Sequence, residues 1–173
     1  MTPSGEPRRL EPEQLGDYVD RLYRAAWALT GNPHDAEDLV QDTYARVLAR
    51  PRFLRHDDDL GYLLQALTNQ HSNRGRRAGA RPAEVPLEAA ANDAGPAFDP
   101  RRPEAAFAVA ELFSAIAGLA PDAREAIAAV DVAGLTYADA AAALGIKEAT
   151  LTTRLHRARR RIAELLSTER AAL

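Results

Sequence analysis

Apolar positions along the chain recur at helical spacing, and turn-forming residues divide them into successive segments. In the first half, the pattern predicts a helix over residues 11–29, a second helix from Pro33 to a stop at Pro51, and a third over residues 60–77. Asn32 is expected to cap the second helix, because its side chain can accept backbone N–H bonds and Pro33 suits the first helical position. Two more helices, over residues 103–117 and 121–130, are each opened by a proline.

Residues 81–102 separate these helices into two groups. This stretch contains four prolines and a glycine among alanines and acidic residues, and it has no periodic apolar pattern. Such a composition is typical of a flexible tether. The fold class that follows is all-α, with two small helical domains over residues 11–80 and 103–167 joined by a flexible, proline-rich linker over residues 81–102.

The most informative pattern lies in residues 134–161, which predict a helix-turn-helix. Thr136 followed three residues later by Asp139 is typical of a capped helix start, and Gly145 stands where a helix ends in a left-handed turn. Ile146 is expected to fill the turn from below. Leu151 and Leu155 then fall on the apolar face of a second helix.

The opposite face of this second helix is basic, which suits phosphate binding. In a helix-turn-helix the first residues of the second helix enter the major groove, and later residues reach the DNA backbone. The candidates for base edges are Lys147, Glu148, Thr150, Thr153 and Arg154, and the candidates for the backbone are His156, Arg157, Arg160 and Arg161, with Arg159 beside them. The alternative is a solvated basic face on an ordinary helical hairpin.

Composition and charge narrow the class further. The chain has 173 residues and no cysteine, which excludes disulfides, thiol catalysis and cysteine-ligated zinc. We expect a cytoplasmic protein, because no apolar run is long enough to span a bilayer and the first residues do not resemble a signal peptide. The net charge of −3 is unusual for a DNA-binding protein, but acidic residues gather in positions 11–42 and arginines in 74–81 and 154–161.

The second predicted helix carries a stripe of acidic residues. Asp35, Asp38 and Asp42 are three and four residues apart and share one face, with Leu39 and Val40 among their apolar neighbours. From the residues alone, this stripe could complement the helix N-terminus, coordinate a metal, meet a basic partner or simply be solvated.

No enzymatic or cofactor site is predicted. His56 is followed by Asp57, Asp58 and Asp59, but consecutive loop residues do not converge on one ion without special turns, and no spaced histidines complete a site. The aspartates are expected to cap the third helix instead. The sequence also lacks a glycine-rich phosphate loop and a defensible nucleophile and base pair.

Three motifs give the chain a family resemblance. Residues 35–44 (DAEDLVQDTY), residues 62–69 (YLLQALTN) and residues 151–159 (LTTRLHRAR) resemble the extracytoplasmic-function branch of the sigma-70 family, which are bacterial transcription initiation factors. The resemblance covers nearly the whole chain in order and spacing. It implies a region 2 domain, a linker and a region 4 domain at the boundaries given above.

The resemblance also implies partners for each surface. The acidic helix is expected to dock on the clamp of the largest subunit of core RNA polymerase, with the flap of the second-largest subunit as a further polymerase contact. The residues implied at the clamp are Asp35, Glu37, Asp38, Leu39, Gln41 and Asp42. Promoter DNA is the other partner, through a minus-ten element for region 2 and a minus-thirty-five element for the helix-turn-helix, and an anti-sigma factor is a further candidate partner.

The third predicted helix has the residue types that opened DNA requires. An aromatic side chain can stack on an unpaired base, amides can hydrogen-bond to it, and arginines can follow the phosphates. The minus-ten candidates are Tyr62, Asn69, Gln70, His71, Asn73, Arg74, Arg76 and Arg77. Tyr62 is equally well explained by core packing.

Four positions depart from the family pattern. Asn73 stands where an aspartate is usual, Tyr62 where a tryptophan is usual, Thr68 near a usual arginine, and Ala149 where a glycine is usual. The change at Asn73 is expected to alter a local salt bridge, and Ala149 to give the recognition helix a more regular start.

The sequence therefore predicts a non-enzymatic sigma factor that attaches core polymerase to selected promoters and helps to open them. Two other functions are consistent with parts of the pattern. A sigma-like protein that sequesters an anti-sigma factor would have damaged base-reading positions, and a helix-turn-helix repressor would bind DNA without polymerase.

Overall fold

The computed structural model describes residues 8–50, 53–54, 59–77 and 103–171. Its first half contains strand β1 (Arg8–Arg9), helix α1 (Pro12–Leu15), a 3-10 turn η1 (Gly16–Tyr18), and helices α2 (Val19–Thr30), α3 (Pro33–Ala49) and α4 (Asp59–Arg77), with strand β2 (Phe53–Leu54) before α4. Its second half contains helices α5 (Pro103–Ala117) and α6 (Pro121–Ile127), a π-helical segment η3 (Ala128–Val132), and helices α7 (Tyr137–Leu144) and α8 (Glu148–Ala171). The all-α fold class is confirmed, and residues 81–102, the predicted tether, lie outside the described residues.

Helix α3 begins and ends where the sequence predicted. The side chain of Asn32 accepts hydrogen bonds from the backbone N–H groups of His34 (2.8 Å) and Asp35 (3.3 Å), and Pro33 occupies the first turn. These bonds satisfy N–H groups that a helix start otherwise leaves unpaired. The helix ends at Ala49, just before Pro51.

Two predicted helices differ from the expectation. The first is not continuous: a capping box between Glu11 and Gln14 opens the short α1, and the chain then tightens into η1 before α2 begins. The helix expected to end at Val130 widens instead into η3 and continues to Val132, and Gly134 then turns the chain with φ of 75°. The spacing of apolar residues in the sequence predicts neither of these changes.

A pair of two-residue strands is the exception to the helical pattern. Arg8 lies opposite Leu54 and Arg9 opposite Phe53 in an antiparallel pair. Asp59, expected only to cap the third helix, is the buried first residue of α4, and its Oδ2 accepts a hydrogen bond from the hydroxyl of Tyr18 (3.3 Å). This bond ties the start of α4 to η1, whereas Asp57 and Asp58 lie outside the described residues.

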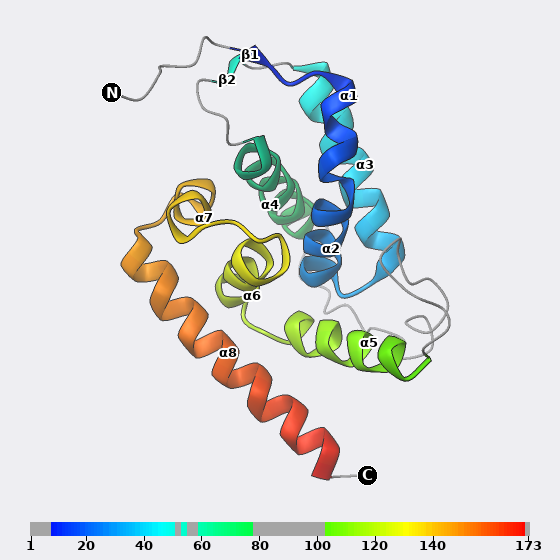
Figure 1. Ribbon diagram of the computed structural model, residues 1–173, viewed down its shortest axis with the longest axis vertical. Coiled ribbons are helices and arrows are strands. Elements are labelled where there is room, and N and C mark those ends of the chain that lie inside the picture. The colour runs from blue at the N-terminus through cyan, green and yellow to red at the C-terminus, as the bar shows by residue number, and fades with distance from the viewer. Residues whose placement is uncertain (1–7, 51–52, 55–58, 78–102, 172–173) are drawn as a thin grey trace.

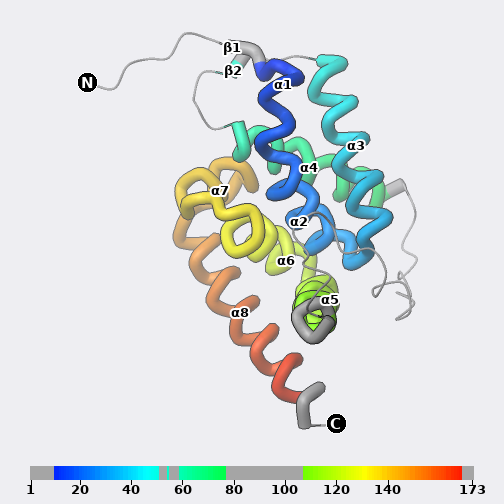
Figure 2. The backbone as a smooth tube through the Cα atoms, turned by 45° about the vertical axis from the view of Figure 1, so that its right-hand side comes forward, coloured from blue at the N-terminus to red at the C-terminus, as the bar shows by residue number. Residues whose placement is uncertain are grey.

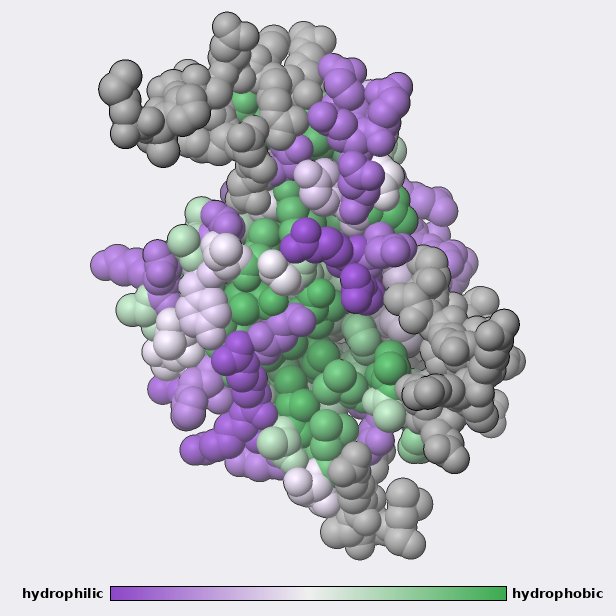
Figure 3. Space-filling model, in the orientation of Figure 1, coloured by the Kyte–Doolittle hydropathy of each residue, from purple (hydrophilic) through white to green (hydrophobic). Residues whose placement is uncertain are grey.

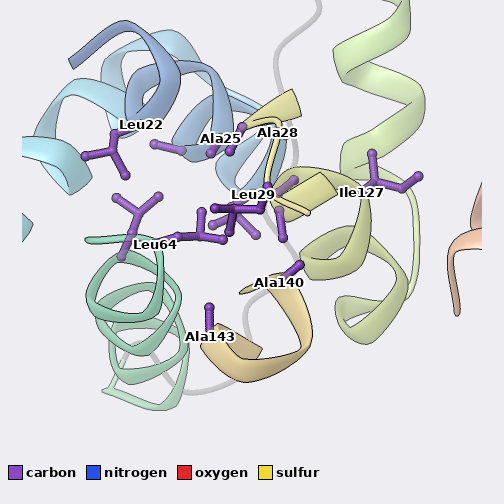
Figure 4. Close-up of a cluster of buried hydrophobic side chains, with 14 of the residues drawn as sticks. Leu22, Ala25, Ala28, Leu29, Leu64, Ile127, Ala140 and Ala143 are labelled. Atoms are coloured by element: carbon purple, nitrogen blue, oxygen red, sulfur yellow. The ribbon is translucent and has the colours of Figure 1, made fainter. Parts of the chain in front are cut away.

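The two halves pack against each other, so they are not joined by the linker alone. Helix α2 contacts η3, α5 and α6, and α4 contacts α7 (Figures 1 and 2). One buried apolar cluster runs from Leu22 and Leu64 of the first half to Ile127 and Ala140 of the second (Figure 4). The two helical halves of the chain thus share one buried core.

Candidate nucleic-acid interface

The helix-turn-helix is built as the sequence predicted. The Thr136 hydroxyl accepts a hydrogen bond from the backbone N–H of Asp139 (3.1 Å) at the start of α7. Gly145 ends the helix with φ of 66°, and the N–H of Ile146 donates to the carbonyl of Ala141 (3.0 Å). These bonds are typical of a glycine-terminated helix end, and they fix the angle between α7 and α8.

Helix α8 divides into a buried apolar face and an exposed polar face. Leu151, Leu155 and Ala158 are buried, each at most 1% exposed. The exposed side carries Lys147, Glu148, Thr150, Thr153, His156, Arg157, Arg160 and Arg161. The structure therefore brings nearly all of the helix-turn-helix candidates onto one solvent-facing surface.

Arg154 is the base-reading candidate that is held by an ion pair. Its side chain is only 27% exposed, and its Nη2 lies 2.7 Å from Oδ2 of Asp122 at the start of α6. Two further arginines of this surface also have an acidic neighbour, since Arg160 and Arg161 lie 3.4 Å and 3.3 Å from the carboxylate of Glu164. The basic face is therefore partly neutralised within the domain.

Arg159 is a structural residue more than a free phosphate ligand. It makes a two-pronged ion pair with Asp131, at 2.6 Å and 2.9 Å, and its Nη1 donates to the hydroxyl of Tyr137 (3.4 Å). These hydrogen bonds raise the pKa of Arg159 above its ordinary value. Asp131 and Tyr137 were not singled out from the sequence, and neither lies at helical spacing from Arg159.

The candidate polymerase-binding residues of α3 lie at the surface, except for one. Asp35, Glu37, Asp38, Gln41 and Asp42 are exposed. Leu39 is 0% exposed and belongs to the core, so its expected contact with a partner is wrong for this arrangement. The apolar pattern had placed Leu39 among the neighbours of the acids, and only the family resemblance grouped it with the contact residues.

Arg74 belongs with this acidic surface and not with a free basic tail. It forms an ion pair with Asp42, and its Nη2 also donates to the backbone carbonyl of Asp38 (3.1 Å). Its guanidinium is therefore engaged between α3 and α4, which departs from the expected phosphate contact.

The other α4 candidates fall into an exposed group and a half-buried group. Asn69 is exposed, and Asn73 accepts a hydrogen bond from exposed Arg76 (2.7 Å). The side-chain carbonyl of Gln70 accepts a hydrogen bond from Arg46 of α3 (3.1 Å), and Tyr62 is half-buried against the core. The side chain of Arg77 lies outside the described residues.

His71 is the α4 candidate that faces the second half of the chain. Burial is the main cause that lowers the pKa of His71, followed by the positive charges of Arg124 and Arg74. Ser72 beside it hydrogen-bonds to the side chain of Glu125 on α6, and burial together with the charge of Asp122 raises the pKa of Glu125. These groups form the polar edge of the contact between α4 and α6.

Three of the four positions that depart from the family pattern have clear local roles. Thr68 is 6% exposed and donates its hydroxyl to the carbonyl of Leu64 (3.1 Å), so it is a core residue. The side-chain carbonyl of Asn73 accepts a hydrogen bond from the charged guanidinium of Arg76. Ala149 lies in the first turn of α8, where its backbone carbonyl accepts a hydrogen bond from the hydroxyl of Thr153 (3.0 Å).

Neither a metal cluster nor a membrane span is found in the part of the chain that the structure describes. Among those residues, the His, Asp and Glu side chains form no group of three or more that could hold a metal ion. None of the described helices combines the length and apolarity needed to cross a membrane. His56 and the two aspartates after it lie outside the described residues.

Two family models match the chain. Residues 15–81 match Sigma-70 region 2, and residues 110–162 match Sigma-70, region 4. These segments contain the acidic helix, α4 and the helix-turn-helix.

Named relatives and a solved structure extend the match over most of the chain. It is 35% identical to the ECF RNA polymerase sigma factor SigE of Mycolicibacterium smegmatis, over 90% of this chain and 61% of the length of SigE. It is 34% identical to the ECF RNA polymerase sigma factor SigM of Mycobacterium tuberculosis H37Rv, over 84% of this chain and 71% of SigM. The sigma factor RpoE of Bartonella quintana, solved in complex with the anti-sigma factor NepR, superposes with a TM-score of 0.68 at 28% identity, covering 90% of this chain and 95% of RpoE. The chain therefore belongs to the sigma-70 family, in its extracytoplasmic-function branch of RNA polymerase sigma factors.

Proposed function

We propose that the chain acts in the cytoplasm as a non-enzymatic sigma factor that joins core RNA polymerase to selected promoters and helps to open them. One observation carries this proposal: the same chain presents an exposed acidic face on α3 and an exposed basic face on α8. A repressor that binds DNA alone requires only the second of these surfaces. Family membership supports the same function.

The acidic face of α3 is the proposed contact with the clamp of the largest polymerase subunit. Asp35, Glu37, Asp38 and Gln41 project to solvent from successive turns. The negative charge of the three acids suits a basic partner, and complementary charges speed association and fix its orientation.

A second polymerase contact is proposed on the region 4 domain. Phe107 is 68% exposed, and Val109 and Leu112 on the same helix are 37% and 38% exposed. Exposed apolar groups of this kind mark protein interaction surfaces. They support α5 as the contact for the flap of the second-largest subunit.

The proposed promoter contacts divide between α4 and α8. Exposed Asn69 and Arg76, together with half-buried Asn73, are available to opened minus-ten DNA, while the first two turns of α8 supply the base-reading groups for the minus-thirty-five element. Exposure of these α8 positions favours a factor that reads DNA over a decoy with damaged reading positions.

An anti-sigma factor is the proposed regulatory partner. The structure of RpoE that resembles this chain was solved with the anti-sigma factor NepR. Its coverage of 90% of this chain, across both domains, supports the transfer of this partner class.

The deciding experiment is transcription in vitro from a pool of genomic fragments, with core polymerase and with or without this protein. We expect discrete new start sites that share a pair of upstream elements. Tight core binding without any new start would contradict the proposal and favour the decoy. Operator binding without polymerase would favour a repressor.

A further inference from the structure

Helix α8 carries an arginine on each border of its buried face. Leu151, Leu155 and Ala158 form this face. At a rotation of about 100° per helical residue, Arg154 lies on one border of the face and Arg159 on the other. Figure 3 shows hydrophilic residues along the outer side of α8 and hydrophobic residues on the side that faces α5 and α6. Both arginines therefore lie where a side chain can reach a neighbouring element.

The two arginines join α8 to different elements. Arg154 pairs with the carboxylate of Asp122 on α6. Arg159 donates from Nε and Nη2 to the carboxylate of Asp131 in η3, and from Nη1 to the hydroxyl of Tyr137 at the start of α7. A single exposed ion pair fixes little, but a two-pronged pair with a third hydrogen bond holds the guanidinium in one orientation. One side chain of α8 is thus tied to both elements that precede it in the region 4 domain.

Asp131 reaches Arg159 from a π-helical segment. The N–H of Ala133 donates to the carbonyl of Ala128 (2.9 Å), which is the bond of a π turn and not of an α turn. A π turn contains more residues than an α turn, so it changes the direction in which the side chains at its end point. Such turns are frequent at functional sites. Here the turn ends beside the partner of the Asp131 carboxylate.

Arg159 is poorly placed to bind a DNA phosphate. Its Nε, Nη1 and Nη2 all donate to groups of the protein, so a phosphate would have to displace Asp131 or Tyr137. Arg160 and Arg161 differ, because their ion pairs are with Glu164 on α8 itself and join the helix to no other element. An effect of Arg159 on DNA reading must therefore act through the orientation of α8.

We propose that Asp131, Arg159 and Tyr137 are positioning residues that set the orientation of α8 and so determine minus-thirty-five specificity without contacting DNA. Thr150 lies nine residues before Arg159, about 13 Å along the helix axis, so a tilt of about 10° at Arg159 would move it by about 2 Å. A shift of this size breaks a hydrogen bond to a base edge. The inference rests on the proposed function, in which α8 reads DNA.

The test is binding of holoenzyme, formed from core polymerase and the full chain, to a preferred minus-thirty-five sequence and to its single-base variants. A role in stability alone would weaken binding to every sequence equally, whereas a change of orientation changes the preference among them. We expect Asp131→Ala to lower this preference about tenfold. Glu164→Ala is the matched control, because it also removes an acid that pairs with arginines of α8, but its pairs lie within the helix. It should leave the preference unchanged.

Arg159→Lys separates positioning from phosphate binding. Lysine keeps the positive charge and could replace a phosphate ligand, but it cannot reproduce the fork to Asp131. We therefore expect Arg159→Lys to lose preference as Asp131→Ala does. Tyr137→Phe keeps the ion pair and should show a smaller loss, which covers the case in which circular dichroism shows that Asp131→Ala has lost helicity.

Two results would overturn the proposal. One is a wild-type preference in Arg159→Lys, which would identify Arg159 as a phosphate ligand or as a residue without effect on reading. The other is the same preference in Asp131→Ala as in Glu164→Ala, with both variants folded. A wild-type holoenzyme without any minus-thirty-five preference would contradict the proposed function instead, so the two failures are distinct.

Discussion

At the scale of single residues, the position of a charged side chain decides whether it is available to a partner. Arg154 and Asp122 make an ion pair in which the arginine is 27% exposed and the aspartate is 67% exposed. The pair lies at the solvent boundary, where such pairs contribute little to stability. Its effect is instead to limit the directions in which Arg154 can reach a base.

Replacing Arg154 should therefore change promoter choice. Arg154→Ala is expected to weaken binding to the preferred minus-thirty-five sequence by about 1–3 kcal/mol and to reduce discrimination at one base position. Binding of holoenzyme to a set of minus-thirty-five variants measures both. Arg160→Ala is the control. We expect it to weaken binding equally on every promoter, and to lower the salt dependence of the binding constant by about one phosphate contact. Equal losses on every promoter for both variants would contradict the role of Arg154.

His71 should make the stability of the protein depend on pH. Burial, with the charges of Arg124 and Arg74, lowers its pKa in the folded protein from the ordinary value of 6.5. The unfolded chain therefore takes up this proton at higher pH than the native chain does. The contribution of neutral His71 is complete above pH 6.5 and is lost as pH falls through 6.5 to the lower folded pKa.

Chemical denaturation of the wild type and His71→Gln, between about pH 7.5 and about pH 5, isolates this effect. The free energy of unfolding of the wild type should fall more on acidification than that of the variant. Glu125, whose pKa is raised by burial and by Asp122, has the opposite effect, but it is present in both proteins. Parallel pH profiles would contradict the assigned environment of His71.

The sequence predicted which residue types form the candidate surfaces better than it predicted which of their side chains are free to contact a partner. It placed most of the exposed acids on α3 and most of the exposed groups on α8 correctly. The family motif grouped buried Leu39 with its exposed neighbours, although the apolar pattern had set it apart from the acids, and no local pattern showed that Arg74 pairs with Asp42. That ion pair joins residues 32 positions apart on α3 and α4.

At the scale of elements, local chemistry determined most helix ends. The caps at Asn32 and Thr136, the proline starts and the turn at Gly145 are set by residues within one helical turn, and the sequence predicted them. The 3-10 turn η1 and the π-helical segment η3 were not predicted. Segment η3 packs against α2, a contact that no local signal in the sequence reveals.

The turn of the helix-turn-helix should be sensitive to the loss of its glycine. Gly145→Ala is expected to lower the free energy of unfolding by about 1 kcal/mol, because φ of 66° is unfavourable for a side chain even though its Cβ would meet no atom within 4 Å. Gly75→Ala is the matched control, since it lies within α4 with equally open space and should raise stability by about 0.5–1 kcal/mol. Thermal or urea unfolding measures the change in the free energy of unfolding for each variant. A change of the same sign in both variants would contradict the left-handed conformation of Gly145.

At the scale of the whole molecule, the opposite charges of α3 and α8 lie on separate surfaces. The double variant Asp35→Lys, Asp38→Lys should lose core polymerase binding by at least about tenfold while keeping its helicity, because both side chains are exposed and neither belongs to the core. Asp17→Lys reverses an exposed acid in η1 and should bind as the wild type does. Binding measured at two salt concentrations separates charge steering from contact loss. Unchanged binding of the double variant would contradict the clamp contact.

The association of the two domains was beyond sequence reasoning. Arg21 meets Ala133 and Gly134 across 112 and 113 positions, and Arg124 meets Leu29 across 95. The motifs identify each domain, but they contain no information on which faces of the domains meet. Only the assembled core shows that α2 serves both halves.

The shared core has a consequence for how strongly the factor competes for polymerase. When only an open chain can bind, its apparent dissociation constant is the intrinsic constant divided by the open fraction. Substitutions such as Gly31→Ala, which push Ala117 away from α2, would then produce a factor that occupies polymerase at lower cellular concentration. The closeness of these two small residues would thereby set the expression level at which the genes controlled by this factor respond.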